Sequence, residues 1–255
     1  MTDDASDALA ARLAEAHRTA SPVDPNGGSA SGLPKSIDAA YCVQTQLIGR
    51  LAVDRGDPVG YKIGFTNERV QTDLGVDEPA YGRLLEATVV DPPASVAAAE
   101  FVGVRIEPEI AFRLDEDLPA DASRTRTRDA VATVHPAIEL VDSRTGWTFD
   151  APLAVADNCL DAGLVLGAGT AIDGRSLGEE AVTLRVDGER VDSGVGADVL
   201  GHPLAALAWL ADAVDGLPAG TLVTTGSLTE PVPVAAEETA TATFASLGSV
   251  ELRVS

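Results

Sequence analysis

The stretch RIEPEIAFRL, from Arg105 to Leu114, places two glutamates inside an otherwise apolar run. The run predicts a strand, so Glu107 and Glu109, two positions apart, lie on the same face of it. Carboxylates held this close repel each other, and burial adds a desolvation cost to each. The pair should therefore either face water or enclose a cation.

A third glutamate, Glu139, lies in the apolar segment HPAIELVDSR, where its neighbours leave it no polar face. Three carboxylates in apolar strands favour a hard divalent cation, Mg²⁺ or Mn²⁺, and the lack of a nearby Cys or His pair argues against zinc. The alternative is an exposed acidic strand face. Pro108 indicates an edge strand, and a lone E-x-E in so acidic a chain is most simply explained by solvent exposure.

Charge is the strongest compositional signal in this 255-residue chain. Asp and Glu number 40 against 18 Lys and Arg, which gives a net charge of -22. Such a surface repels phosphate backbones and argues against nucleic-acid binding. The only lysines are Lys35 and Lys62. Acidic excess with so little lysine predicts a protein of a halophile, and an ordinary acidic protein is the alternative.

Several features predict a cytoplasmic protein that does not bind membranes. No apolar run reaches the length of a membrane span, and the acidic N-terminus MTDDASDALAARLAEAHRTA does not resemble a signal peptide. Cys42 and Cys159 lie far apart without a redox or zinc spacing, which favours a reducing compartment.

Residues 1–20 predict an amphipathic helix, and a loop rich in Gly, Pro and Ser follows it. Ser36 and Gly56 are typical of the start and the end of a second helix. Two more helices are predicted at 127–134 and 202–214. The predicted strands span residues 59–65, 104–114, 136–142, 162–167, 181–188, 221–226, 241–246 and 249–255.

Runs of strands with occasional helices predict an α+β fold with a rolled or sandwiched sheet. We expect residues 1–35 to form an extension and residues 36–255 to form a single catalytic domain. No G-x-G-x-x-G motif or Walker loop occurs, which argues against dinucleotide and P-loop chemistry. The G-x-S-x-G match at residues 174–178 is not followed by a predicted helix, so it is no serine-hydrolase elbow.

Lys62 lies in the apolar strand GYKIGF, which Thr66 and Asn67 follow. A surface lysine is the usual interpretation of this residue type. Because the chain retains so few lysines, an ammonium that pairs with an anionic substrate or moves a proton is an equal alternative.

The remaining candidates carry weaker signals. Asp77 in GVDEPAYGRL is a turn former or a functional acid. His135 and His202 each precede proline, and we expect capping or packing roles at helix boundaries. The segment Thr224–Ser227 offers hydroxyls and backbone N–H groups to a ligand, but a tight turn explains it equally well.

Several motifs together resemble the 2-keto-4-pentenoate hydratase family, within the larger fumarylacetoacetate hydrolase-like group. In order they are YKIGFTN, GVDEPAYGRL, RIEPEIAF, PAIELVDSR, ADNCLDAGLVLG, LGHPLAALAWLA and TTGSLTEPVPV. The resemblance runs from about Ile37 to Val254. It implies a mixed β-roll of the fumarylacetoacetate hydrolase C-terminal-domain type and a homo-oligomer, a pentamer or decamer.

The resemblance also implies roles for particular residues. It implies one Mg²⁺ or Mn²⁺ ion bound by Glu107, Glu109 and Glu139. Lys62 and Asp77 match the family's lysine and aspartate and are the predicted catalytic residues. The predicted substrate-binding residues are Thr66, Asn158, Thr225 and Ser227.

Two departures from the family pattern concern the pocket. Leu160 stands where a small hydroxyl residue is common, and Thr221 stands where an aspartate is common. Leu160 could alter the pocket wall near the substrate.

The function implied is hydration of 2-hydroxypenta-2,4-dienoate, the enol of 2-oxopent-4-enoate, to 4-hydroxy-2-oxopentanoate in aromatic meta-cleavage catabolism. The metal would chelate the carboxylate and the C2 oxygen of this small 2-keto acid. Lys62 would hold the carboxylate or relay a proton. Asp77 and an ordered water are both candidates for the general base.

Three alternatives remain. A 4-oxalocrotonate-type decarboxylase would need another cation for its second carboxylate, and Arg83, Arg105 and Arg144 leave that open. A C–C hydrolase of the fumarylacetoacetate type should carry a His–Glu pair, which we do not find. A non-catalytic cation-binding assembly subunit would have no evident need of Lys62.

Overall fold

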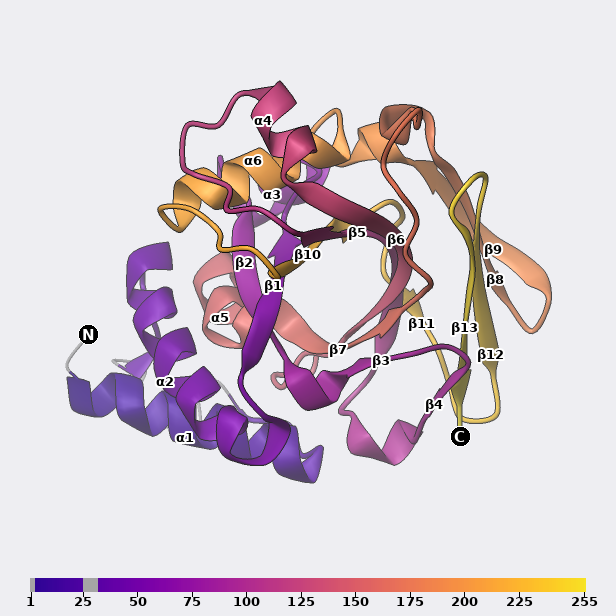
Figure 1. The fold of residues 1–255 in the computed structure, drawn as a ribbon. Coiled ribbons are helices and arrows are strands. Elements are labelled where there is room, and N and C mark those ends of the chain that lie inside the picture. The colour runs from indigo at the N-terminus through magenta and orange to yellow at the C-terminus, as the bar shows by residue number, and fades with distance from the viewer. Residues whose placement is uncertain (1–2, 25–31) are drawn as a thin grey trace.

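The computed structural model describes residues 3–24 and 32–255, which form two β-sheets with helices packed around them (Figure 1). The helices are α1 (Asp3–Thr19), α2 (Ile37–Arg55), α3 (Glu68–Leu74), α4 (Arg124–Asp129), α5 (Ala151–Ala156) and α6 (Pro203–Ala213). The short 3₁₀ turn η4 (Asn158–Leu160) follows α5. This arrangement confirms the predicted α+β class.

The first sheet has the strand order β2-β1-β10-β5-β6-β7-β3, and β11 pairs with β5. Its strands are β1 (Pro58–Gly64), β2 (Ala80–Leu85), β3 (Val89–Val90), β5 (Arg105–Leu114), β6 (Val131–Val141), β7 (Asp161–Leu166), β10 (Leu222–Ser227) and β11 (Val232–Pro233). The central strands β10, β5 and β6 pair antiparallel. The sheet curls visibly in Figure 1, as expected for a β-roll.

The second sheet has the order β4-β13-β12-β8-β9 and stands on one side of the first (Figure 1). Its strands are β4 (Ala94–Val96), β8 (Ala181–Val186), β9 (Glu189–Val195), β12 (Thr239–Phe244) and β13 (Gly248–Val254). Apolar side chains of both sheets and of α6 form one continuous core.

Helices α1 and α2 lie side by side, outside the curled sheet (Figure 1). Leu13 of α1 and Leu47 of α2 are fully buried in a second core, which also contains Cys159 of η4. Ser36 caps α2 by accepting a hydrogen bond from the N–H of Ala39, as predicted. The boundary at residue 35 stays a prediction, and residues 1, 2 and 25–31 of the extension lie outside the described residues.

The helix predicted at 127–134 is wrong over most of its length. Helix α4 ends at Asp129 and β6 begins at Val131. The β-branched Val131, Thr133 and Val134 all pair with β5. Strand pairing and the β-preference of these side chains outweigh the helical periodicity.

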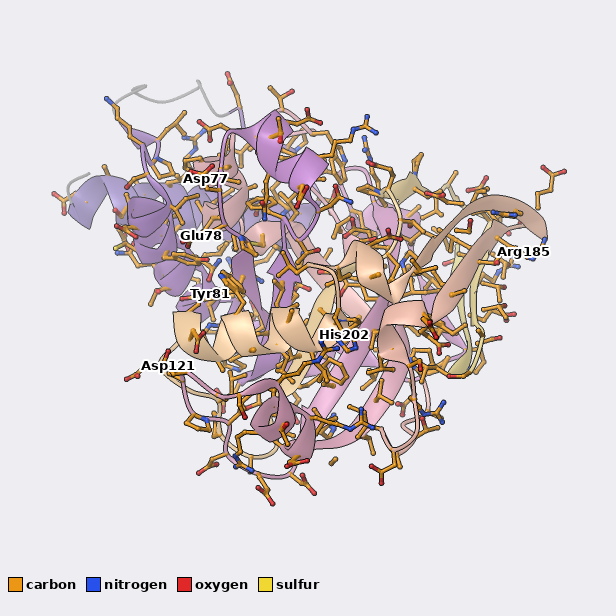
Figure 2. All side chains as sticks on the ribbon, turned by 90° about the horizontal axis from the view of Figure 1, so that it is seen from above. Asp77, Glu78, Tyr81, Asp121, Arg185 and His202 are labelled. Atoms are coloured by element: carbon orange, nitrogen blue, oxygen red, sulfur yellow. The ribbon has the colours of Figure 1, made fainter. Side chains whose placement is uncertain are left out.

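His202 and His135, the two histidines that precede proline, lie in different kinds of element. His202 caps α6 as predicted, because its Nδ1 accepts a hydrogen bond from the Leu204 N–H at 3.1 Å (Figure 2). His135 lies inside β6 and not at a helix boundary, with Nδ1 2.8 Å from the Gly167 carbonyl oxygen. Both are accounted for by structural contacts.

Across residues 3–24 and 32–255, the helices are either too short or too polar to cross a membrane.

Candidate metal centre

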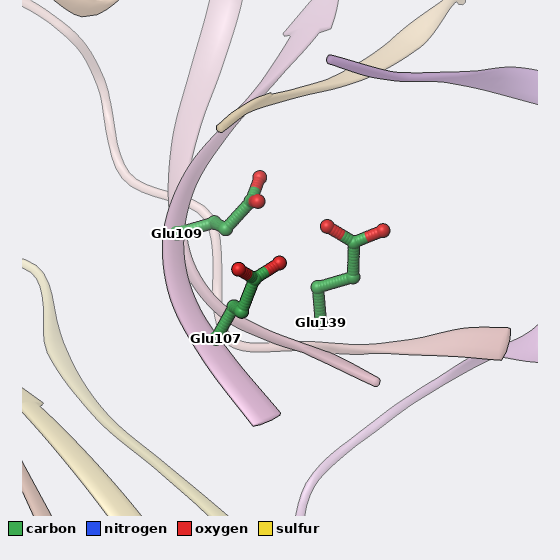
Figure 3. A group of neighbouring side chains, drawn as sticks. All are labelled: Glu107, Glu109 and Glu139. Atoms are coloured by element: carbon green, nitrogen blue, oxygen red, sulfur yellow. The ribbon is translucent and has the colours of Figure 1, made fainter. Parts of the chain in front are cut away.

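Glu107, Glu109 and Glu139 converge on the curled side of the first sheet (Figure 3). Strands β5 and β6 place Glu107 directly opposite Glu139. One carboxylate oxygen from each residue lies within 4.8 Å of the others. Glu109 and Glu139 are fully buried, and Glu107 is half-buried. The burial of these residues therefore excludes the alternative of an exposed acidic strand face.

The buried carboxylate oxygens of this cluster have few hydrogen-bond donors near them. Glu109 Oε2 accepts a hydrogen bond from the Gly226 N–H at 3.0 Å. Among the described residues, Glu109 Oε1 and Glu139 Oε2 have no hydrogen-bond partner. Buried carboxylate oxygens are normally satisfied, so these unpaired oxygens fit a cation. All donors being oxygen suits a hard divalent ion.

Gly226 must be a glycine for this contact to form. Its φ of +104° lies in the region that only glycine adopts readily. A side chain there would bring a Cβ atom to within 2.3 Å of Thr66 Oγ1.

Ionisation of all three carboxyl groups is unfavourable in this buried cluster, and their pKa values are raised. Burial, followed by the charge of Glu139, raises the pKa of Glu107 to about 7. Burial likewise raises the pKa of Glu109 to about 7. Burial raises the pKa of Glu139 well above its ordinary value, although Lys62 opposes the shift. A divalent cation would remove this repulsion and favour the ionised carboxylates.

Lys62 completes the cluster from β1. Its Nζ lies 3.0 Å from Glu139 Oε1 and donates a hydrogen bond to the Cys159 carbonyl oxygen at 3.0 Å. Burial lowers the pKa of Lys62, but Glu139 and then Glu107 outweigh burial, and the pKa lies above its usual value. Lys62 is therefore an ammonium in this arrangement and acts as a donor.

A cavity of about 460 Å³ opens beside Lys62 and Glu107. Thr66 and Ser227, two of the predicted substrate-binding residues, line it. Five of its lining residues pack together and form an apolar wall: Phe65, Val141, Trp147, Phe149 and Leu160. Four acidic residues also line it and are exposed or half-buried: Asp73, Asp192, Asp198 and Glu230.

The other predicted residues do not line this cavity. Asn158 is buried, and its side-chain amide forms two hydrogen bonds with the backbone of strand β2. Its Oδ1 accepts from the Arg83 N–H at 2.7 Å, and its Nδ2 donates to the Arg83 carbonyl at 2.9 Å. The Thr225 hydroxyl is fully buried and donates to the Ile110 carbonyl at 2.9 Å. Asp77 is exposed, in the segment after α3 (Figure 2). None of the three is brought to the cavity.

Sequence reasoning missed the aromatic part of the cavity wall. Trp147 and Phe149 lie close together, with ring centroids 6.2 Å apart. The signal was an aromatic pair in a chain where only 4% of residues are aromatic. Asp161 was also missed: it is buried, and burial raises its pKa to about 6.

Arg83, Arg105 and Arg144, the three arginines considered for a second carboxylate, do not line the cavity. Arg144 is buried and pairs with Asp157. Arg83 stacks on the Tyr61 ring at 4.1 Å, and Arg105 stacks on the Trp147 ring at 3.8 Å. Lys62 is the only cationic residue among those that line the cavity in the described chain.

Comparison with known proteins agrees with this geometry. Residues 62–255 match the family described as fumarylacetoacetate (FAA) hydrolase C-terminal. The 2-keto-4-pentenoate hydratase of Burkholderia vietnamiensis (strain G4 / LMG 22486) is 38% identical over 259 residues, covering 98% of each chain. A 4-oxalocrotonate decarboxylase of Pseudomonas putida is 34% identical over 227 residues, covering 84% of each.

A solved structure is similar over its whole length. The 4-oxalocrotonate decarboxylase from Pseudomonas putida G7, complexed with magnesium and adipate, has a TM-score of 0.93 at 30% identity. The match covers 100% of this chain and 99% of that one.

Fold and site together define an enzyme class with a carboxylate centre suited to a divalent cation. The chain belongs to the fumarylacetoacetate hydrolase C-terminal family, and its relatives include enzymes named 2-keto-4-pentenoate hydratase. The predicted family and fold type are confirmed.

Proposed function

We propose that this enzyme is a hydro-lyase that adds water to 2-hydroxypenta-2,4-dienoate to give 4-hydroxy-2-oxopentanoate in aromatic meta-cleavage catabolism. The observation that carries the proposal is the convergence of Glu107, Glu109 and Glu139 beside Lys62 at the polar end of a cavity. Hydratase relatives that align over nearly the whole chain support the same activity.

The three glutamates would hold Mg²⁺ or Mn²⁺, which would supply Lewis-acid polarisation of a 2-oxo acid. Lys62 has three N–H donors, of which one faces Glu139 and one the Cys159 carbonyl. The third is available to an oxygen of the bound anion. Lys62 would thus orient the substrate and stabilise negative charge on its oxygen.

The proton acceptor for water addition at C4 would be a water in the cavity. Asp77, the other candidate, is exposed and lies outside the cavity lining. The apolar wall of Phe65, Trp147 and Leu160 would keep the hydrocarbon end of the dienoate away from bulk water.

The charge of the cavity favours a substrate with one carboxylate. A decarboxylase of the 4-oxalocrotonate type must hold a second carboxylate at the far end of its substrate. Apart from Lys62, the described residues that line the cavity are uncharged or acidic, and Arg83, Arg105 and Arg144 are not among them. An unpaired carboxylate there would be repelled and poorly solvated.

The test is the loss of dienol ultraviolet absorbance, with metal and after treatment with EDTA. We expect turnover that stops on chelation and returns with Mg²⁺ or Mn²⁺. Undiminished turnover in stripped enzyme would end the metal-dependent mechanism. Release of CO₂ from 4-oxalocrotonate at a higher kcat/KM than dienol hydration would favour the decarboxylase.

We further propose that the enzyme acts in the cytoplasm and assembles as a homo-oligomer, a pentamer or decamer. We also propose that it comes from a halophile. The charge of -22 and the scarcity of lysine support the halophile. Light scattering at high and low salt would measure the assembly.

A further inference from the structure

A buried ionic network of His17, Arg144 and Asp157 lies outside the lining of the cavity. His17 of α1 contributes Nε2, 3.2 Å from Asp157 Oδ1. The Arg144 Nε donates to both Asp157 carboxylate oxygens at 2.9 Å, and the Arg144 N–H donates to Oδ2 at 3.0 Å. All three residues are at most 7% exposed. So costly a set of buried polar groups calls for an explanation.

The hydrogen bonds identify the state of the His17 ring. Arg55 Nη1 lies 3.3 Å from His17 Nδ1, and Arg55 can only donate. Nδ1 therefore accepts, and the ring proton resides on Nε2, which donates to Asp157. A neutral imidazole satisfies both partners. Burial, followed by Arg144, lowers the pKa of His17 to about 4, which agrees with a neutral ring.

Asp157 begins a strained turn. Asn158, Cys159 and Leu160 follow it with φ of +56°, +50° and +65°. Three consecutive non-glycine residues in this region are rare, and such strain persists only where surrounding contacts hold it. The Asp157 carbonyl accepts from the Leu160 N–H at 2.9 Å and from Arg144 Nη2 at 3.0 Å.

Two groups of the strained turn contact the candidate site or line its cavity. The Cys159 carbonyl oxygen receives the hydrogen bond from Lys62 Nζ at 3.0 Å. The Leu160 side chain forms part of the apolar wall. Asp157 is therefore linked to the Lys62 ammonium through the turn and the Cys159 carbonyl.

We propose that His17, on the N-terminal helix, is a positioning residue for the reaction: through Asp157 it holds the left-handed turn that orients Lys62. The proposal rests on the proposed function for its kinetic consequence. His17 precedes residues 62–255, the part that matches the family, so the N-terminal helix becomes part of the active-site support. It contacts neither substrate nor the glutamates and acts only through Asp157.

The test compares His17→Leu with His17→Gln, whose side-chain amide can still donate to Asp157. We expect His17→Leu to lower kcat by about 10-fold or more, as is typical for groups that orient a ligand-binding residue, and His17→Gln to retain most activity. Mg²⁺ affinity, measured by calorimetry, should change little in either variant.

The matched control is Asp7→Asn. Asp7 Oδ1 pairs with Arg50 Nη2 at 2.6 Å, so this exposed ion pair joins α1 to α2 without touching the turn. Such pairs contribute little stability, and we expect kcat of this variant to match that of the unmodified enzyme. An equal loss of kcat in Asp7→Asn and His17→Leu would show that helix docking, and not the turn, matters.

Lysine-selective isotope labelling gives a readout independent of turnover. The chain has only Lys35 and Lys62, so ¹³C NMR of labelled lysine Cε shows two signals. The Lys62 signal should move in His17→Leu and stay in place in Asp7→Asn. An unmoved Lys62 signal together with unchanged kcat in His17→Leu would overturn the proposal.

Two further outcomes keep the tests separate. If the unmodified enzyme hydrates no dienoate, the proposed function fails, while the Lys62 signal still tests the positioning role. If His17→Leu does not fold, His17→Asn replaces it, because its shorter amide occupies the Nδ1 position and cannot reach Asp157. Activity of His17→Asn equal to that of His17→Gln would then contradict the proposal.

Discussion

Lys62 is the residue on which the proposed chemistry depends most. It is 3% exposed, and its ammonium lies between Glu139 and the Cys159 carbonyl. A buried lysine with a carboxylate partner is a costly arrangement that a purely structural role does not need. Replacing it by methionine removes the charge while keeping most of the volume.

We expect Lys62→Met to lower kcat by about 10²–10⁴-fold, because the donor to the substrate oxygen is lost. Mg²⁺ binding should persist, since the three glutamates remain. Dienol absorbance and calorimetry measure the two effects. Unchanged turnover with intact metal binding would contradict the role of Lys62, and no turnover even in the unmodified protein would favour the non-catalytic subunit.

Leu160 is the second residue with a specific consequence. It packs in the cavity wall, at a position where the resemblance implied a small hydroxyl residue. We expect Leu160→Ser to lower the ratio of kcat/KM for 2-hydroxyhexa-2,4-dienoate to that for the pentadienoate by about 10-fold, because one methyl group in an apolar pocket contributes roughly that factor. An unaltered ratio would show that the substrate tail does not reach Leu160.

At the scale of elements, the register of β5 and β6 forms the metal centre. Glu107 lies opposite Glu139 in that register. A slip of one residue would turn Glu139 to the other face of the sheet, away from Glu107 and Glu109. The carboxylate cluster is therefore a property of strand pairing as much as of residue type.

Strand β2 approaches the turn η4 at Gly82 too closely for a side chain at that position. A Cβ atom on Gly82 would lie 2.3 Å from the Asn158 carbonyl oxygen, a backbone atom that cannot yield easily. We expect Gly82→Ala to lower the free energy of unfolding by about 1–3 kcal/mol and to reduce turnover by moving the turn. Urea denaturation measures the first effect.

The control for this substitution is Gly49→Ala. Gly49 lies on the exposed side of α2, with nothing within 4 Å of its added Cβ atom. Because alanine is the better helix former, this variant should be more stable by about 1 kcal/mol. Similar effects of the two substitutions would contradict a steric conflict at Gly82.

At the scale of the whole molecule, the metal centre couples stability to pH. The pKa of Glu107 and of Glu109 rises from 4.5 to about 7 in the fold, so without metal the folded state binds more protons than the unfolded chain. The contribution of these groups to stability is present below pH 4.5 and is lost as pH rises through 7. A bound cation favours the ionised forms and reverses this trend.

The stabilisation by Mg²⁺ should therefore grow between pH 6 and pH 8, as fewer protons must leave the glutamates on binding. Thermal unfolding with and without Mg²⁺ measures the shift in Tm at each pH. Calorimetry in two buffers of different ionisation enthalpy should detect proton release at pH 6. A shift in Tm independent of pH, with no proton release, would contradict the raised pKa values.

The net charge of -22 predicts a dependence of stability on salt. Raising NaCl from about 0.1 M to 1 M shortens the Debye length from about 10 Å to about 3 Å and screens repulsion between surface carboxylates. We expect Tm to rise over this range. A Tm that stays constant or falls would argue against a protein adapted to high salt.

Much of the fold could be predicted because its signals are local. The helices α1, α2 and α6 and most longer strands follow from periodicity and from caps such as Ser36. Strand β2 and the start of β6 were missed, because they are defined by their pairing with β1 and with the end of β5. Short strands depend on such partners more than on their own composition.

The candidate site divides in the same way. The sequence by itself determined that Glu107, Glu109, Glu139 and Lys62 are anomalous, because ionisable side chains in apolar strands carry a desolvation cost that composition already reveals. Only the tertiary structure decided that these four converge, whereas Asp77, Asn158 and Thr225 lie outside the cavity lining.

Tertiary structure also decided the role of the N-terminal helix. Nothing in the local sequence relates His17 to Asp157, which is 140 positions away. Their contact exists because α1 packs on α2 and both share a core with the turn at Cys159. Burial cost is a property of a residue and its neighbours in the chain, whereas proximity across the fold depends on how every element packs.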